Sequence, residues 1–184
     1  MEFANALVTF ALGVGVACAQ PAGAPDAAFA QAAQLAQRAA GGDTSAVEGS
    51  IEAFQGLVAQ APANPLYRTY LGMTLSLKGR DAWMPWSKVK YTERGLDEID
   101  RGLGALKPEH DRALMRGVPL ALEARLVAAR TFLRVPDDIF HRRADGRKLL
   151  AQVLADPQFP GAPEGFREAV QRAATEAGLR EAGR

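Results

Sequence analysis

Residues 92–108 read TERGLDEIDRGLGALKP and have the pattern of one amphipathic helix that ends before a proline. In a helix over 92–106, Gly95 and Gly102 flank Ile99. Small residues let two helices approach closely, while a large apolar residue fills a groove of the neighbouring helix. The stretch therefore predicts a helix that packs against a partner helix. Its apolar face carries Leu96, Ile99, Leu103 and Leu106.

Six further segments have the same helical period, and short turns with proline or glycine separate them. Gly79 is expected to end one helix, and Gly117-Val118-Pro119 to break another, because proline cannot continue the hydrogen bonds of a helix. No stretch alternates apolar and polar residues long enough to predict a strand. The pattern predicts an all-α fold of stacked antiparallel helical hairpins. The six segments are 26–40, 45–60, 66–78, 110–134, 138–155 and 164–181.

The composition indicates one globular domain. The chain has 184 residues and a net charge of +1, with 48% hydrophobic and 23% charged residues, which is too apolar for general disorder. This near-neutral charge gives no reason to expect binding to nucleic acid. One cysteine and two histidines exclude an internal disulfide and most Cys/His metal sites. We therefore expect no metal and no cofactor.

Residues 7–19, LVTFALGVGVACA, have the length and composition of the apolar core of a signal peptide. Ala17-Cys18-Ala19 fits a cleavage site, so residues 1–19 are predicted to be a signal peptide of a periplasmic or secreted protein. The preceding MEFAN lacks the usual Lys or Arg. Two alternatives remain open: Cys18 carries a lipid anchor, which would be the protein's one membrane contact, or residues 3–19 form a buried helix.

Residues between positions 50 and 108 recur at the spacing of a helical repeat. The first set is Ser50, Phe54, Leu57 and Pro62; the next is Leu71-Gly72, Gly79, Gly95, Ile99, Gly102 and Pro108. This pattern resembles the tetratricopeptide repeat (TPR), which has small and aromatic residues, a Leu-Gly pair and a final proline at such positions. Leu57 departs from the small residue of that family. The resemblance implies a short TPR-like solenoid of about three units.

The resemblance also divides the chain. A linker over 20–25 precedes a TPR-like domain over 26–157, in which 110–157 keeps only the helix–turn–helix outline of a third unit. Residues 158–184 are expected to form a proline-rich turn and a C-terminal capping helix or tail. An insertion over 81–91 delays one helix of the second unit. With this insertion the chain is similar to exported bacterial repeat proteins of unknown role, which implies a fold but no activity.

The insertion carries the most unusual residues of the chain. Trp83 and Trp86 flank Met84-Pro85, and several basic side chains follow. Aromatic side chains beside basic groups bind anionic or aromatic ligands and form hot spots for partner proteins. Alternatively, both indoles fill a gap between hairpins. The candidate binding residues are Tyr67, Tyr70, Trp83, Trp86, Lys88, Lys90 and Arg94.

A second basic run consists of His141-Arg142-Arg143 with Arg147 and Lys148. It indicates either a solvated helix face or a site for phosphate or an acidic peptide. Asp137 and Asp138 precede this run, and we expect them to cap the helix rather than to bind a metal.

The sequence contains no motif that predicts catalysis. G-x-S-x-G, H-E-x-x-H, EF-hand and C-x-x-C patterns are all absent. We therefore expect a non-enzymatic module of the bacterial cell envelope that binds a protein or peptide partner on the concave face of its helical stack. Two alternatives are a periplasmic small-ligand-binding accessory protein of a transport system and a purely structural part of an envelope complex.

Overall fold

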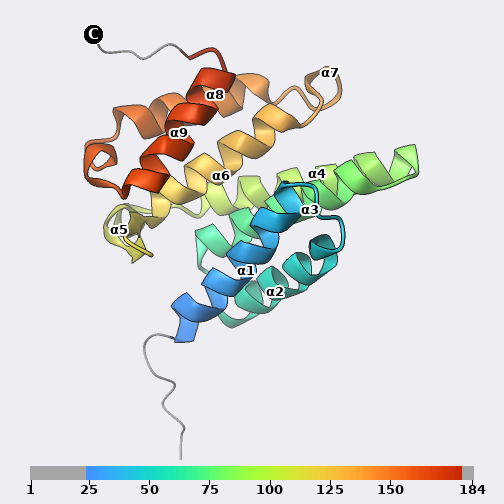
Figure 1. Ribbon diagram of the computed structural model, residues 1–184, viewed down its shortest axis with the longest axis horizontal. Helices are drawn as coiled ribbons and strands as arrows, with labels where there is room; N and C mark the ends of the chain where they lie inside the picture. Colours follow the sequence, from blue (N-terminus) through green and yellow to red (C-terminus); the bar gives the residue numbers. More distant parts are fainter. Residues whose placement is uncertain (1–23, 180–184) are drawn as a thin grey trace, which may run out of the picture.

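The computed structural model describes residues 24–179, most of which lie in α-helices (Figure 1). The predicted signal peptide, residues 1–19 with Cys18, lies outside the described residues. The non-helical elements are β1 (Leu114–Met115) and β2 (Val118–Pro119), and η1 (Phe159–Gly161) is a short 3-10 helix. The α-helices are α1 (Ala24–Ala40), α2 (Ala46–Gln60), α3 (Pro65–Asp81), α4 (Pro85–Gly104), α5 (Pro108–Arg112), α6 (Leu120–Arg134), α7 (Asp137–Phe140), α8 (Arg143–Ala155) and α9 (Glu164–Glu176).

The helices pack as successive hairpins. α1 packs on α2, α3 on α4 and α6 on α8, and α9 then packs on α8. The hairpins contact one another through α3, which also packs against α1, α2 and α6. In Figure 1, α1 and α2 lie at the bottom, α4 crosses the middle, and α6, α8 and α9 lie at the top. The predicted all-α fold of stacked hairpins is confirmed.

Direct contact between two backbones holds the α3–α4 hairpin together. A Cβ atom on Gly95 would lie 2.5 Å from the carbonyl oxygen of Gly72, and one on Gly102 would lie 2.9 Å from that of Pro65. Both distances are too short for a side chain, so glycine at these positions lets the helices touch. Ile99, between the two α4 glycines, is fully buried. The small–large–small pattern therefore packs α4 closely against α3, as predicted.

The hydroxyl groups at this contact bond within their own helix. Thr69 Oγ1 donates to the carbonyl oxygen of Pro65 at 2.9 Å, and Ser76 Oγ donates to that of Gly72 at 3.0 Å. Both residues are buried. Because each hydroxyl is hydrogen-bonded, these small polar side chains fit the contact without the cost of an unpaired donor.

Two predicted boundaries near the insertion are wrong. Gly79 lies inside α3 rather than at its end, because it forms another close contact: a Cβ there would lie 2.9 Å from the carbonyl oxygen of Lys88. α4 begins at Pro85, so most of the 81–91 insertion extends the helix predicted over 92–106. Proline suits the first turn of a helix, where its missing N–H leaves no hydrogen bond unmade.

Two breaks divide the later helical segments. The predicted break at Gly117-Val118-Pro119 is present, and it contains an antiparallel β1–β2 hairpin that the sequence did not predict. Arg116, with φ of 53°, lies in its turn. The helix predicted over 138–155 is divided at His141, whose backbone is left-handed with φ of 54°. A left-handed residue cannot continue a right-handed helix.

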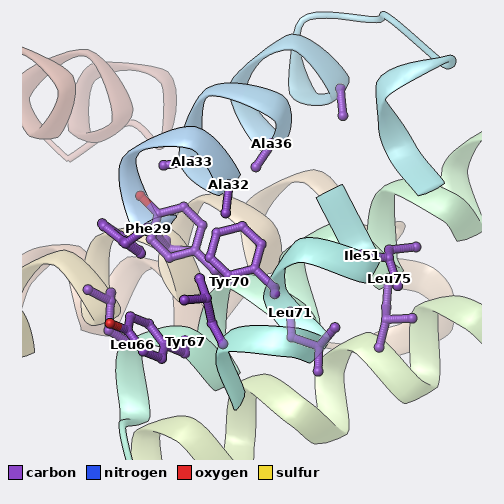
Figure 2. Packing of buried hydrophobic residues seen from close by; sticks show 14 of the residues in the cluster. Phe29, Ala32, Ala33, Ala36, Ile51, Leu66, Tyr67, Tyr70, Leu71 and Leu75 are labelled. Carbon is purple, nitrogen blue, oxygen red and sulfur yellow. The ribbon is translucent and has the colours of Figure 1, made fainter. Parts of the chain in front are cut away.

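Aromatic rings join the first two hairpins in the largest apolar cluster (Figure 2). Phe29 of α1 stacks on Tyr67 with 5.7 Å between ring centroids and meets Tyr70 edge-on at 5.3 Å. Phe54 of α2 stacks on Tyr70 at 4.9 Å. Such ring pairs add stability beyond the area that they bury. Small residues of α1 are buried beside these rings, namely Ala32, Ala33 and Ala36.

α9 buries one face against the last hairpin. Val170 is fully buried, and it belongs to a second apolar cluster with residues of α6 and α8, including Leu122 and Leu150. This contact covers apolar surface that the α6–α8 hairpin would otherwise expose. Over residues 24–179, no helix combines the length and the apolar character needed to cross a membrane.

Replacing Gly95 by alanine tests the backbone contact. The added Cβ would lie 2.5 Å from the carbonyl oxygen of Gly72, so we expect the free energy of unfolding to fall by about 1–3 kcal/mol. Gly56→Ala is the matched control, because its Cβ would meet nothing within 4 Å in α2. Better helix propensity should make this variant more stable by up to about 1 kcal/mol. Urea unfolding measures both changes. Equal effects of the two substitutions would contradict the assignment of Gly95 to a contact between the α3 and α4 backbones.

Candidate functional site

A groove of about 1060 Å³ opens between two parts of the fold. Its lining comes from α1, α3 and the start of α4, and from the β1–β2 hairpin, α6, α7 and α9. Apolar walls with a few polar groups are typical of sites that bind small ligands or peptide segments. The apolar lining includes Met73, Leu77, Val89, Val127, Ile139 and Phe166.

The groove contains a buried carboxylate. Glu123 of α6 lines it with a side chain that is only 6% exposed. Its Oε1 accepts hydrogen bonds from the Tyr70 hydroxyl at 2.7 Å and from the Arg116 guanidinium at 2.6 Å. Its Oε2 is buried and has no hydrogen-bond partner among the described residues. A buried acceptor without a partner costs free energy.

Three separate elements position this carboxylate. Tyr70 comes from α3 and Glu123 from α6, while Arg116 reaches them from the turn between β1 and β2. The Arg116 guanidinium also lies 4.9 Å from the ring centroid of Phe29, a cation–π contact. Since each partner belongs to a different packed element, the geometry exists only in the folded chain.

The surroundings of Glu123 shift its acid–base behaviour. Burial raises the pKa of Glu123, while the hydrogen bond from Tyr70 and the positive charge of Arg116 oppose that rise. Burial and the neighbouring negative charge of Glu123 raise the pKa of the Tyr70 hydroxyl above its usual value, so this hydroxyl keeps its proton and remains a donor.

The structure places two of the predicted binding residues in the groove. Tyr70 and Lys88 both line it, and Lys88 Nζ donates to the carbonyl oxygen of Arg80 at 3.0 Å. Tyr67 instead lies in the aromatic cluster against Phe29 and is 4% exposed. It does not line the groove.

The other four predicted residues lie on the outside of the α3–α4 hairpin. Trp83 is 89% exposed and Trp86 is 65% exposed, so neither indole fills a gap between hairpins. Lys90 and Arg94 are exposed on α4, and none of these four side chains lines the groove. Figure 1 shows the green, amino-terminal end of α4 reaching past the other helices. The seven predicted residues therefore do not form one site.

Glu123 and Arg116 are not among the binding residues predicted from the sequence. A signal for Glu123 was present, because Leu126 and Val127 follow it by three and four positions and share its buried face of α6. A carboxylate on an apolar face requires a partner inside the fold. Arg116 carries no comparable signal, since its role depends on the conformation of a turn.

The second basic run is divided between different partners. Arg142 pairs with Asp100, with N–O distances of 2.8 and 2.6 Å, and its guanidinium lies over the Phe132 ring. Asp137 and Asp138 lie inside α7 rather than before a single helix, and Asp137 Oδ1 accepts a hydrogen bond at 2.8 Å from the backbone N–H of Arg143, the first residue of α8. In the part of the chain with described side chains, no three His, Cys, Asp or Glu residues gather where they could hold a metal.

No protein-family model, curated protein or solved structure matches the chain. The likeness to tetratricopeptide repeats thus depends on the residue spacing in the sequence.

The raised pKa of Glu123 predicts a pH dependence of stability. The folded chain holds this proton more tightly than the unfolded chain, in which the pKa is near its usual 4.5. The stabilisation is complete below that value and is lost as pH rises through the folded-state pKa. We expect the unfolding free energy of the native chain minus that of Glu123→Gln to decrease over this range. Urea unfolding at several pH values measures the difference, and a constant or rising difference would contradict the prediction.

The exposure of both indoles predicts that they contribute little to stability. The double substitution Trp83→Ala with Trp86→Ala should change the free energy of unfolding by no more than about 0.5 kcal/mol. Phe132→Ala is the contrasting variant, because this ring is 1% exposed and its loss should cost about 3–5 kcal/mol. Thermal unfolding followed by circular dichroism compares them. A large loss from the tryptophan variant would mean that the indoles are structural.

Proposed function

We propose that this protein is a non-enzymatic interaction module of the bacterial cell envelope, which binds a segment of a partner protein or peptide in the groove. The observation that carries the proposal is the buried Glu123 carboxylate, with an unpartnered Oε2, inside an apolar groove of about 1060 Å³. The envelope location rests on the signal-like sequence of residues 7–19. The TPR-like spacing of the helical hairpins supports the same kind of function.

The groove suits a mainly apolar segment that brings a hydrogen-bond donor. Met73 and Val127 both line the groove, and burying apolar side chains of the segment against such residues would supply most of the binding free energy. A donor on the segment, such as an amide or a hydroxyl, would pair with Oε2 of Glu123. Because Tyr70 and Arg116 already hold the carboxylate, little ordering is required on binding.

A small-ligand-binding accessory protein of a transport system is the second candidate. Its support is the groove volume of about 1060 Å³, which is just above the range of about 300–1,000 Å³ for small-molecule pockets. The two candidates differ in how much of the groove is covered. A peptide segment would bury side chains along the length of the groove, whereas a small ligand would bury only the side chains around Glu123.

A peptide array probed with the full chain tests the proposal. Met73→Glu puts a charge on the apolar wall, and binding to the selected peptides should weaken at least about tenfold, or 1.4 kcal/mol. Leu114→Glu is the matched control, because Leu114 is 61% exposed and does not line the groove. Circular dichroism establishes that both variants are folded. Peptides that bind Met73→Glu as tightly as the native chain would overturn the proposal.

A further inference from the structure

A second hollow, of about 220 Å³, lies between α6, α8 and α9. Its lining is rich in arginine: Arg130 and Arg134 come from α6, while Arg143 and Arg147 come from α8. The basic run of the sequence supplies only the α8 pair. Packing of α6 on α8 brings the two pairs together.

The positive charge of this hollow is not balanced by neighbouring carboxylates. Glu176 is the acidic residue of its lining, and none of the four arginines forms an ion pair within the described part of the chain. Arginine elsewhere in the fold is usually paired. The arginines with ion-pair partners are Arg38, Arg68, Arg80, Arg101, Arg116, Arg125, Arg142 and Arg172.

Electrostatic repulsion is present within the hollow. Partial burial lowers the pKa of Arg130, the positive charges of Arg134 and Arg172 lower it further, and Glu176 acts in the opposite direction. A bound anion would remove this repulsion and would also satisfy guanidinium N–H groups.

Helix ends do not account for the positive charge. The start of α8 lies beside the last turn of α6, since a Cβ on Gly146 would be 2.9 Å from Cγ of Leu133. The positive end of one helix dipole therefore adjoins the negative end of the other, and the two partial charges offset each other. The four guanidinium groups thus dominate the local field.

We infer that this hollow binds a phosphate-type oxyanion through the guanidinium groups of Arg130, Arg134, Arg143 and Arg147. The planar guanidinium donates two parallel hydrogen bonds to adjacent phosphate oxygens, and it stays charged at any physiological pH. The hollow adjoins the groove, because Arg130 and Arg134 line both, whereas Arg143 and Arg147 line the hollow and not the groove. The phosphate group belongs either to a dissolved small molecule or to the headgroup of an anionic lipid.

Titration of the full chain with inorganic phosphate, at constant ionic strength set with chloride, tests this site by calorimetry. The double variant Arg134→Gln with Arg147→Gln should bind phosphate at least about tenfold more weakly. Both side chains are exposed on helix surfaces, so the fold should tolerate the changes. Lys148→Gln is the matched control, because Lys148 is exposed on α8 beside Arg147 but does not line the hollow. It should leave the affinity within about twofold.

Two results would overturn the inference: absence of phosphate binding, or equal loss of binding in the arginine and lysine variants, which would indicate diffuse attraction only. Vesicles of phosphatidylglycerol and of phosphatidylcholine then separate the two sources of the phosphate group. Binding to phosphatidylglycerol that the arginine variant loses assigns a lipid headgroup. Phosphate binding without vesicle binding assigns a dissolved ligand.

Because Arg130 and Arg134 line both sites, single variants at residues that line only one of them separate phosphate binding from peptide binding. Met73→Glu, which alters the groove, should bind phosphate like the native chain, since Met73 does not line the arginine hollow. Arg147→Gln should bind the array peptides like the native chain. A loss of both activities in either single variant would instead show a disturbed fold, which circular dichroism detects.

Discussion

The backbone contact between α3 and α4 is the constraint on which the other packing depends. Gly72 and Gly95 lack the side chains that would hold the two helices apart. The contact fixes α3 on one side, and α1, α2 and α6 pack on its remaining surface. Since one central helix touches every neighbouring hairpin, its position determines where the walls of the groove lie.

Tyr70 connects this packing to the chemistry of the groove. Its ring lies between Phe29 and Phe54, while its hydroxyl holds the carboxylate of Glu123. The residue that fills the core therefore also orients the polar group of the groove. The adjoining arginine hollow shares Arg130 and Arg134 with the groove and adds the guanidinium groups of Arg143 and Arg147. The net charge of +1 does not show this local concentration of positive charge.

Much of the fold follows from local patterns in the chain. The helical period predicts the helices, and the spacing of Gly95, Ile99 and Gly102 predicts close packing on a partner helix, which the structure shows to be α3. The break at Gly117-Val118-Pro119 is predictable for the same reason, since proline acts on the backbone beside it. The predicted end of α3 at Gly79 is wrong. A glycine there is typical of a helix end, but Gly79 allows close contact with α4 instead.

Such local patterns do not predict the candidate sites. Tyr70 and Glu123 are 53 positions apart and meet only when α3 packs on α6. The exposure of Trp83 was likewise set by packing, because the α3–α4 hairpin extends past its neighbours and nothing in the described fold covers its end. The sequence alone thus determines the helical class, the break before α6 and the small–large–small face of α4, since these depend on near neighbours. Burial, pairing and the grouping of charges depend on distant segments, so only the tertiary structure decides them.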